Sequence, residues 1–260
     1  MKIPIYQVDA FSDHLFGGNP AGVCPLQEWL PDRTMQNIAM ENNLSETAFF
    51  VETDDLFHIR WFTPLAEVDL CGHATLASAH VIFEFLKWKS PTIKFSSRSG
   101  VLVVKKEMDL LTLNFPSDDI KETVLPVSLL ESLKIKPIES FKGKTDFLIV
   151  IGSQAEVEQL DPDFGLMKKS GCRGVMVTAQ GNEVDFVSRF FAPQVGVDED
   201  PVTGSAHTSL TPYWSKKLGK TELTALQLSK RKGRLWCKYL GDRVEISGKA
   251  TTYLVGEIWI

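Results

Sequence analysis

The sequence lacks most of the features that mark specialised protein classes. Only four of its 260 residues are cysteines, and no two of them form a C-x-x-C pair. This pattern indicates neither a disulfide framework nor a common zinc site, and we expect a reduced, cytoplasmic protein. There is no G-x-G-x-x-G or G-x-x-x-x-G-K-[ST] motif, which argues against a nucleotide cofactor.

Charge and hydropathy exclude two further classes of partner. The net charge is −5 and no long basic run occurs, so nucleic acid is not an expected partner. No apolar run is long enough to span a bilayer, and the opening residues turn polar too soon for a signal peptide. We therefore expect no membrane partner either.

An internal repeat is the most informative feature that is present. Three pairs of segments match in chain order: Arg60-Trp61-Phe62-Thr63-Pro64 with Arg189-Phe190-Phe191-Ala192-Pro193, Val68-Asp69 with Val197-Asp198, and, after three inserted residues, Gly72-His73-Ala74 with Gly204-Ser205-Ala206. Five single residues follow in the same way: Ser96, Arg98, Gly100, Leu102 and Asp109 with Ser229, Arg231, Gly233, Leu235 and Asp242. The common order and the slowly growing offset indicate a duplication.

The duplication predicts the domain organisation and the fold class. We expect one domain over residues 1–115, to which residues 251–260 are candidates to return, and a second over residues 116–250. The fold class is α+β, with two similar domains that each form a mostly antiparallel sheet or barrel around a helix. Like halves that face each other leave a cleft, and we expect the active site there.

The same order of elements is predicted in each half. Two β-prone runs form a hairpin, and a Gly-x-Ala step then opens a helix. In the first half these elements are Thr47–Val51, the turn Glu52-Thr53-Asp54-Asp55, Phe57–Phe62 and the helix Ala74–Leu86. In the second half they are Val175–Ala179, Val184–Phe191 and the helix Ser205–Leu218.

Prolines mark two further helix expectations. A helix over Pro31–Asn42 begins at its proline, and Val157–Lys169 stands at the comparable place in the second half. Because proline has no N–H to donate, Pro212 is expected to kink the helix Ser205–Leu218 or to divide it in two.

The two matching helix starts are candidate binding positions. The first turn of a helix has unpaired N–H groups, which suit a carboxylate, and glycine lets a ligand approach the backbone closely. We therefore expect Gly72, Gly204 and Ser205 to bind an anionic substrate. The alternative is that these are two ordinary capped helix starts.

The residues just before these glycines differ between the halves. Cys71 matches Thr203, and a two-base racemase would need a thiol at both places. Glu46 lies at the mouth of an apolar strand, where partial desolvation would raise its pKa toward the range useful for proton transfer. The alternatives are a small buried cysteine and an ordinary surface glutamate.

An acidic cluster precedes the second helix start. The cluster is Asp198-Glu199-Asp200, and an aspartate there could cap the helix, hold a substrate hydroxyl or orient His73. Metal binding by Asp198, Asp200 and His207, or by Cys71 and His73, is the rival, but these spacings match no common zinc or calcium site. We expect neither a metal nor another cofactor.

Five short stretches together resemble one family. They are Gly18-Asn19-Pro20-Ala21-Gly22-Val23, Asn43-Leu44-Ser45-Glu46-Thr47, Arg60-Trp61-Phe62-Thr63-Pro64, Cys71-Gly72-His73-Ala74-Thr75 and Asp200-Pro201-Val202-Thr203-Gly204-Ser205-Ala206. The chain resembles the phenazine-biosynthesis isomerase (PhzF-like) family, whose fold is that of diaminopimelate epimerase. The resemblance implies a cofactor-independent homodimer with Glu46 as catalytic acid/base and with His73, Asp200 and Ser205 assisting it or holding substrate.

These observations predict an isomerase that moves a proton on a small carboxylic acid. Glu46, His73 and Asp200 are the expected catalytic residues, and we expect Asn19, Gly72, Gly204 and Ser205 to bind the substrate. Cys71 departs from the pattern of the phenazine enzymes proper, so an epimerase that uses Cys71 remains a rival. A non-catalytic protein that binds a small molecule is the second rival.

Overall fold

Strands dominate the chain, as its β-branched and aromatic runs predict. The computed structural model describes residues 1–53 and 56–260. Its first elements are β1 (Lys2–Ala10), β2 (Asn19–Leu26), α1 (Asp32–Asn42), β3 (Glu46–Glu52), β4 (Phe57–Phe62), β5 (Glu67–Val68), α2 (Gly72–Glu84), β6 (Thr92–Ser97), β7 (Gly100–Glu107) and β8 (Leu110–Pro116). Residues Asp54 and Asp55 of the predicted hairpin turn lie outside the described residues.

The remaining elements repeat part of this order. They are β9 (Lys121–Glu122), α3 (Val127–Leu133), β10 (Glu139–Lys142), β11 (Phe147–Val150), α4 (Gln154–Glu158), α5 (Phe164–Lys168), β12 (Val175–Gln180), β13 (Phe186–Ala192), the 3-10 helix η1 (Pro193–Val195), β14 (Val197–Asp200), α6 (Gly204–Leu218), β15 (Glu222–Gln227), β16 (Gly233–Tyr239), β17 (Arg243–Gly248) and β18 (Ala250–Trp259). The chain divides into two units, residues 1–114 with 247–260 and residues 115–246. The α+β class is confirmed.

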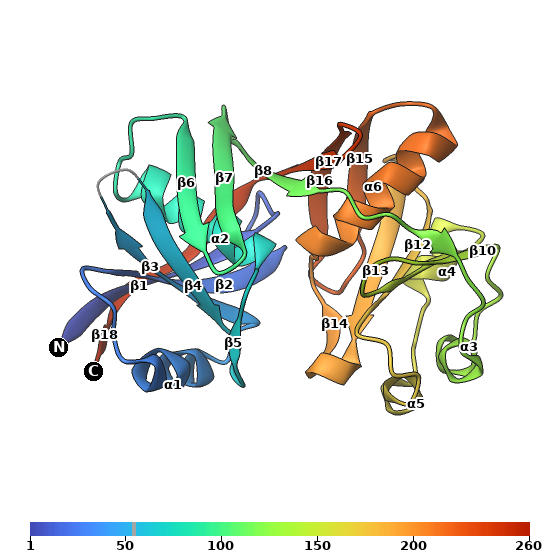
Figure 1. Ribbon diagram of the computed structural model, residues 1–260, viewed down its shortest axis with the longest axis horizontal. Coiled ribbons are helices and arrows are strands. Elements are labelled where there is room, and N and C mark those ends of the chain that lie inside the picture. The colour runs from blue at the N-terminus through green and yellow to red at the C-terminus, as the bar shows by residue number, and fades with distance from the viewer. Residues whose placement is uncertain (54–55) are drawn as a thin grey trace. The chain divides into compact units, whose positions relative to one another are not determined.

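The first unit is a mostly antiparallel sheet around a buried helix. Strand β1 pairs with β2 and with β18, which brings the two ends of the chain side by side (Figure 1). Parallel pairing joins β2 to β3 and β4 to β6, and antiparallel pairing continues through β7 to β8. Helix α2 is buried from His73 to Ala79, because the sheet surrounds it and its sequence is apolar on every side.

A second core lies on the other face of the first sheet. There α1 packs Met35 and Ile38 against side chains such as Ile5, Cys24 and Phe49. The helix begins after Pro31 and ends at Asn43, whose φ of 48° lies in the left-handed region. These two cores hold both faces of β1 to β3, the strands that carry the candidate residues Asn19 and Glu46.

The second unit uses the same order of pairing. Strands β12, β13, β15 and β16 correspond to β3, β4, β6 and β7, with β11 parallel to β12 and β15 parallel to β13. Helix α6 occupies the place of α2 and ends at Gly219, whose φ of 68° suits a residue without a Cβ. On the other face of this sheet, an apolar core packs Val177 and Val187 against Leu129 of α3, Val157 of α4 and Met167 of α5.

The structure corrects two matches in the repeat. Ser96 pairs with His58, whereas Leu226 pairs with the equivalent Val187, so the predicted match between Ser96 and Ser229 is wrong. Trp61 pairs with Val68 on the next strand, whereas its match Phe190 pairs with Asp200. Asp200 therefore stands where the first unit has Val68, and the predicted match between Val68-Asp69 and Val197-Asp198 is wrong. The three extra residues lie before β14, where the 3-10 helix η1 stands, and not after it.

Helix α6 is continuous over Gly204–Leu218, so the alternative that Pro212 divides it in two is wrong, and the kink stays a prediction. Proline cannot donate to the carbonyl oxygen four residues earlier, which belongs to Thr208. The backbone N–H of Asp118 donates to that oxygen at 3.1 Å instead. An external donor therefore replaces the missing helical bond, and the helix need not divide.

The single helix predicted over Val157–Lys169 is wrong. The segment instead contributes to two short helices, α4 and α5, each begun by a side-chain cap. The oxygen of Ser153 caps the first, and that of Asp163 accepts from the N–H of Leu166 in the second. Pro162 separates them, because a residue before proline is disfavoured in the helical region.

Among the described residues, no helix combines the length and apolarity that a membrane crossing requires.

Candidate functional site

The first unit presents a histidine at the start of its buried helix. Cys71 is the N-cap of α2, with extended φ and ψ of −145° and 108°, and Gly72 is the first helical residue. His73 follows with its side chain only 6% exposed. The imidazole of His73 therefore lies buried in the first turn of α2 and not at the surface.

Glu46 lies beside this histidine. It is the first residue of β3, and one of its carboxylate oxygens, Oε2, is 3.2 Å from His73 Nε2. The carboxylate is 19% exposed, so it is neither sealed in the core nor free in solvent. Glu46 and His73 therefore lie side by side within this one unit, and their expected catalytic roles stay predictions.

The other ring nitrogen of His73 has a different neighbour. The amide nitrogen of Asn19 lies 3.2 Å from His73 Nδ1. An amide nitrogen can only donate, so Nδ1 accepts and the ring proton sits on Nε2. Asn19 thus places the N–H of the imidazole on the side of the Glu46 carboxylate.

Burial sets the charge of the imidazole. The pKa of His73 lies below its ordinary value because the buried ring loses the solvation that favours its charged form. The ring is therefore neutral near pH 7. A neutral, buried imidazole does not readily gain a proton, so Glu46 is the other group of this pair that can exchange one.

Cys71 approaches the ring from the Nδ1 side. Its sulfur is 3.5 Å from His73 Nδ1, and the residue is 7% exposed. Glu46, Cys71 and His73 offer ligand atoms within 4.8 Å of one another, which makes them the candidate metal cluster of this unit. Within this cluster the thiol lies nearest to Nδ1 of the ring and the carboxylate nearest to Nε2.

Backbone conformation explains how Asn19 reaches the histidine. Gly18 has φ of 61°, and a Cβ there would lie 2.1 Å from the carbonyl oxygen of Ala10. Only glycine tolerates both the left-handed conformation and the close approach. Asn19 then pairs with Ala10 at the start of β2 and is fully buried.

The second unit presents a hydroxyl and a carboxylate at the matching place. Thr203 is the N-cap of α6, and its hydroxyl donates to Asp200 at 2.6 Å. Gln227 receives the backbone N–H of Thr203 at 2.8 Å and donates to the carbonyl oxygen of Asp200 at 2.7 Å. Asp200 is therefore held against the end of α6 by both of its neighbours.

Gly204 and Ser205 occupy the first turn of α6, as expected. Gly204 is buried, whereas Ser205 is exposed at the end of the helix. Next along the helix, the fully buried His207 donates from Nδ1 to the carbonyl oxygen of Thr203 at 2.8 Å. This buried bond holds the carbonyl group of Thr203, the N-cap residue, against the first turn of α6.

The structure gathers the predicted residues into two sets. Glu46, Gly72, His73 and Asn19 lie together in the first unit, and Asp200, Gly204 and Ser205 lie together in the second. The expectation that the two sets serve one cleft stays a prediction.

Sequence reasoning missed two contacts. It took Asn19 as a substrate ligand without its bond to His73, and it did not single out Gln227. A signal for Gln227 did exist, because it continues the buried positions Leu223 and Ala225 of β15 as a fully buried polar residue.

Comparisons with known proteins agree over nearly the whole chain. The family model of phenazine biosynthesis-like proteins matches residues 8–256. An uncharacterized isomerase of Pseudomonas aeruginosa is 53% identical, over 99% of both chains. The crystal structure of a PhzF-family phenazine biosynthesis protein from Enterococcus faecalis has a TM-score of 0.98 at 44% identity and covers 100% of both chains.

A more distant likeness concerns the fold alone. A hydroxyproline epimerase from Agrobacterium vitis, solved with bound trans-4-hydroxy-L-proline, has a TM-score of 0.65 at 9% identity. The matched region covers 99% of this chain and 92% of the epimerase chain. The predicted epimerase-like fold of two similar halves is confirmed.

Proposed function

The chain belongs to the phenazine biosynthesis-like protein family and is an isomerase, and from that premise we propose that it moves a proton on a small carboxylic acid with Glu46 as the acid/base. The observation that carries the proposal is the 3.2 Å contact between Glu46 and a buried histidine. Among the described residues of the first unit, Glu46 is the carboxylate that meets this histidine.

The proposed step is balanced within the substrate. The Glu46 carboxylate takes a proton from a carbon activated by a neighbouring double bond or carbonyl, and the electron pair of the C–H bond moves into that system. The carboxylic acid of Glu46 then returns the same proton to another carbon. No oxidant, reductant or co-substrate is consumed, so the product is an isomer of the substrate.

His73 has a distinct role in this proposal. Its Nε2 lies 3.2 Å from the carboxylate but outside hydrogen-bond geometry, and we propose that its N–H turns to Glu46 and stabilises the ionised form before the proton is taken. A neutral ring does not compete with Glu46 for the substrate proton. We propose that Asn19 acts through His73 by fixing its tautomer.

The helix starts supply the anion-binding part of the proposal. The backbone N–H groups at Gly72 and Gly204 belong to first turns of helices, where an anion is favoured. Ser205 adds an exposed hydroxyl, and Asp200 is held in place beside it on the preceding strand by Thr203. We propose that these groups hold the substrate carboxylate and its polar substituents.

Replacement of Glu46 tests the proposal. Small unsaturated and 2-oxo carboxylic acids are incubated in D2O with the protein, and isomerisation or hydrogen exchange is followed by proton NMR. Loss of the titrating group should lower turnover of an accepted acid by at least about 100-fold in Glu46→Gln, since general acid–base catalysis contributes about 10²–10⁴-fold. Glu52→Gln is the matched control, because Glu52 lies on the same strand and is exposed. Full activity of Glu46→Gln would refute the assignment.

An epimerase that uses Cys71 is the second candidate. The contact between its sulfur and His73 Nδ1 favours it, because a base beside a thiol assists ionisation. Against it, the matching residue of the second unit is Thr203, whose hydroxyl cannot serve as the second base. Inactive Cys71→Ala beside active Glu46→Gln would favour this candidate over the first.

A further inference from the structure

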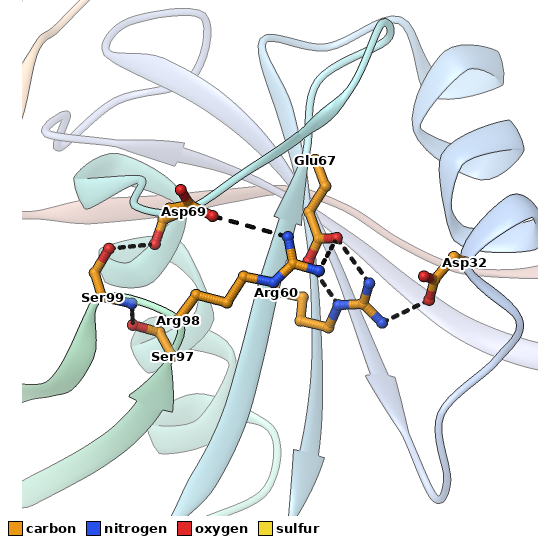
Figure 2. A network of polar contacts seen from close by, with 7 residues as sticks. All are labelled: Asp32, Arg60, Glu67, Asp69, Ser97, Arg98 and Ser99. Atoms are coloured by element: carbon orange, nitrogen blue, oxygen red, sulfur yellow. Dashed lines mark hydrogen bonds and ion pairs between the residues drawn. The ribbon is translucent and has the colours of Figure 1, made fainter.

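A network of charged side chains lies on the approach to α2 (Figure 2). Arg60 on β4 binds Glu67 on β5 with two parallel hydrogen bonds, from Nε at 2.7 Å and from Nη2 at 2.8 Å. Arg60 also donates to Asp32 at 2.8 Å. Arg60 and Glu67 are 18% and 14% exposed, so this forked pair is more strongly held than a surface ion pair.

The same network reaches the loop that leads to the candidate site. Arg98, from the turn between β6 and β7, binds Glu67 at 2.7 Å and lies 3.8 Å from the carboxylate of Asp69. The next residue, Ser99, donates its hydroxyl to the backbone carbonyl oxygen of Asp69 at 2.8 Å. Asp69 stands two residues before Cys71, so these contacts determine the path of the chain into α2.

The second unit contains the same arrangement. Arg189 on β13 binds Glu199 on β14 with two parallel hydrogen bonds, at 2.6 Å and 3.0 Å. Ser229 donates its hydroxyl to the backbone carbonyl oxygen of Pro201 at 2.9 Å. Each unit therefore has an arginine–glutamate fork on the hairpin and a serine from the following turn.

The correspondence is positional as well as chemical. Asp69 and Pro201 each stand three residues before the glycine that opens the helix, Gly72 or Gly204. The turns that supply Ser99 and Ser229 differ in length, with two residues between β6 and β7 and five between β15 and β16. The serine contact is kept although the turn around it has changed.

We propose that Ser99 and Ser229, together with the two arginine–glutamate forks, are positioning residues that set where the first turn of each central helix stands. The proposal rests on the proposed function, because the groups positioned are His73 in one unit and Gly204 and Ser205 in the other. A contact to a loop carbonyl adds nothing to the apolar core. It constrains the two residues between that carbonyl and the helix glycine.

Serine replacement tests this with a direct view of the histidine. In protein labelled with 15N in its histidines, NMR of the His73 ring reports its tautomer and surroundings. We expect Ser99→Ala to shift the His73 ring signals and to lower turnover about threefold to tenfold, the effect of one hydrogen bond. Ser99→Thr, which retains the hydroxyl, should restore both. Ser90→Ala is the control, because the Ser90 hydroxyl oxygen accepts a turn hydrogen bond from the backbone N–H of Thr92 at 3.2 Å, away from the loop before α2.

The second unit supplies an independent arm. We expect Ser229→Ala to lower turnover by a similar factor while leaving the ring signals of His73 unchanged, since its contact is to Pro201. Equal turnover and equal ring signals in Ser99→Ala and Ser90→Ala would overturn the proposal. The proposal would also be overturned if the loss of turnover in each variant were proportional to the drop in its melting temperature, because the serines would then act only on stability. If Glu46→Gln is fully active while Ser99→Ala still shifts the ring signals, the proposed function fails and the positioning role stands.

Discussion

His207 should make the stability of the second unit depend on pH. Its ring is fully buried on α6, where Nδ1–H donates to Thr203, and Nε2 has no hydrogen-bond partner among the described residues. Burial lowers the pKa of His207 to about 4, from an ordinary value of 6.5. The folded protein therefore resists a protonation that the unfolded chain accepts.

The sign and size of the effect follow from that difference. Because the folded-state pKa is the lower one, the full contribution of His207 is present above the unfolded pKa and is lost as pH falls from about 6.5 toward about 4. Each pH unit in this interval lowers the free energy of unfolding by about 1.4 kcal/mol. The loss reaches about 2 kcal/mol at about pH 5 and about 3 kcal/mol once the folded protein is protonated as well.

The variant His207→Asn isolates this contribution. The asparagine amide nitrogen can replace Nδ1–H as donor to Thr203, but the side chain does not titrate. The smaller residue should destabilise the protein at about pH 7.5, yet the variant should lose about 2 kcal/mol less than the wild type on transfer to about pH 5. Urea unfolding curves at both pH values give the difference, and His73, which shifts in the same direction, is common to both proteins. Equal losses in the two proteins would refute the reasoning.

Three further predictions concern other parts of the chain. Gly18→Ala should lower the free energy of unfolding by at least about 2 kcal/mol in urea titration, because its Cβ would collide with the carbonyl oxygen of Ala10 in a left-handed backbone. Arg189→Lys should cost about 1–3 kcal/mol in the same assay, since lysine cannot form the fork to Glu199. Analytical ultracentrifugation should give the expected homodimer a mass of about twice the chain mass of 29.1 kDa. A species of single-chain mass at micromolar concentration would contradict this expectation.

The repeat made much of the fold predictable. Both hairpins, both central helices and the glycine stop of α6 could be read from alternating apolar residues and from Gly219. The missed features depend on distant partners. The continuity of α6 through Pro212 requires a donor from Asp118, and nothing near Pro212 in the sequence predicts that donor.

The candidate site was predictable by residue type but not by contact. A glutamate opening an apolar strand and a histidine after a helix glycine were recognisable as unusual, and they do meet. The role of Asn19 was not, because it depends on which ring nitrogen it reaches after β1 and β2 pair. The match of Val68 was misread as Val197 instead of Asp200, because three inserted residues were placed after β14 instead of before it.

The difference between the two helix starts supports the proposed reaction with one base. The first unit has a titratable pair, Glu46 and His73, at the start of its helix. At the matching position of the second unit, Thr203 replaces the thiol and its hydroxyl bond to Asp200 engages the carboxylate there. The two units thus have the same order of strands and a central helix. At these two helix starts, among the described residues, the first unit places a carboxylate beside an imidazole and the second does not. Such an asymmetric pair suits a proton that leaves and returns on one face of the substrate, whereas a symmetric racemase needs an acid and a base on opposite faces.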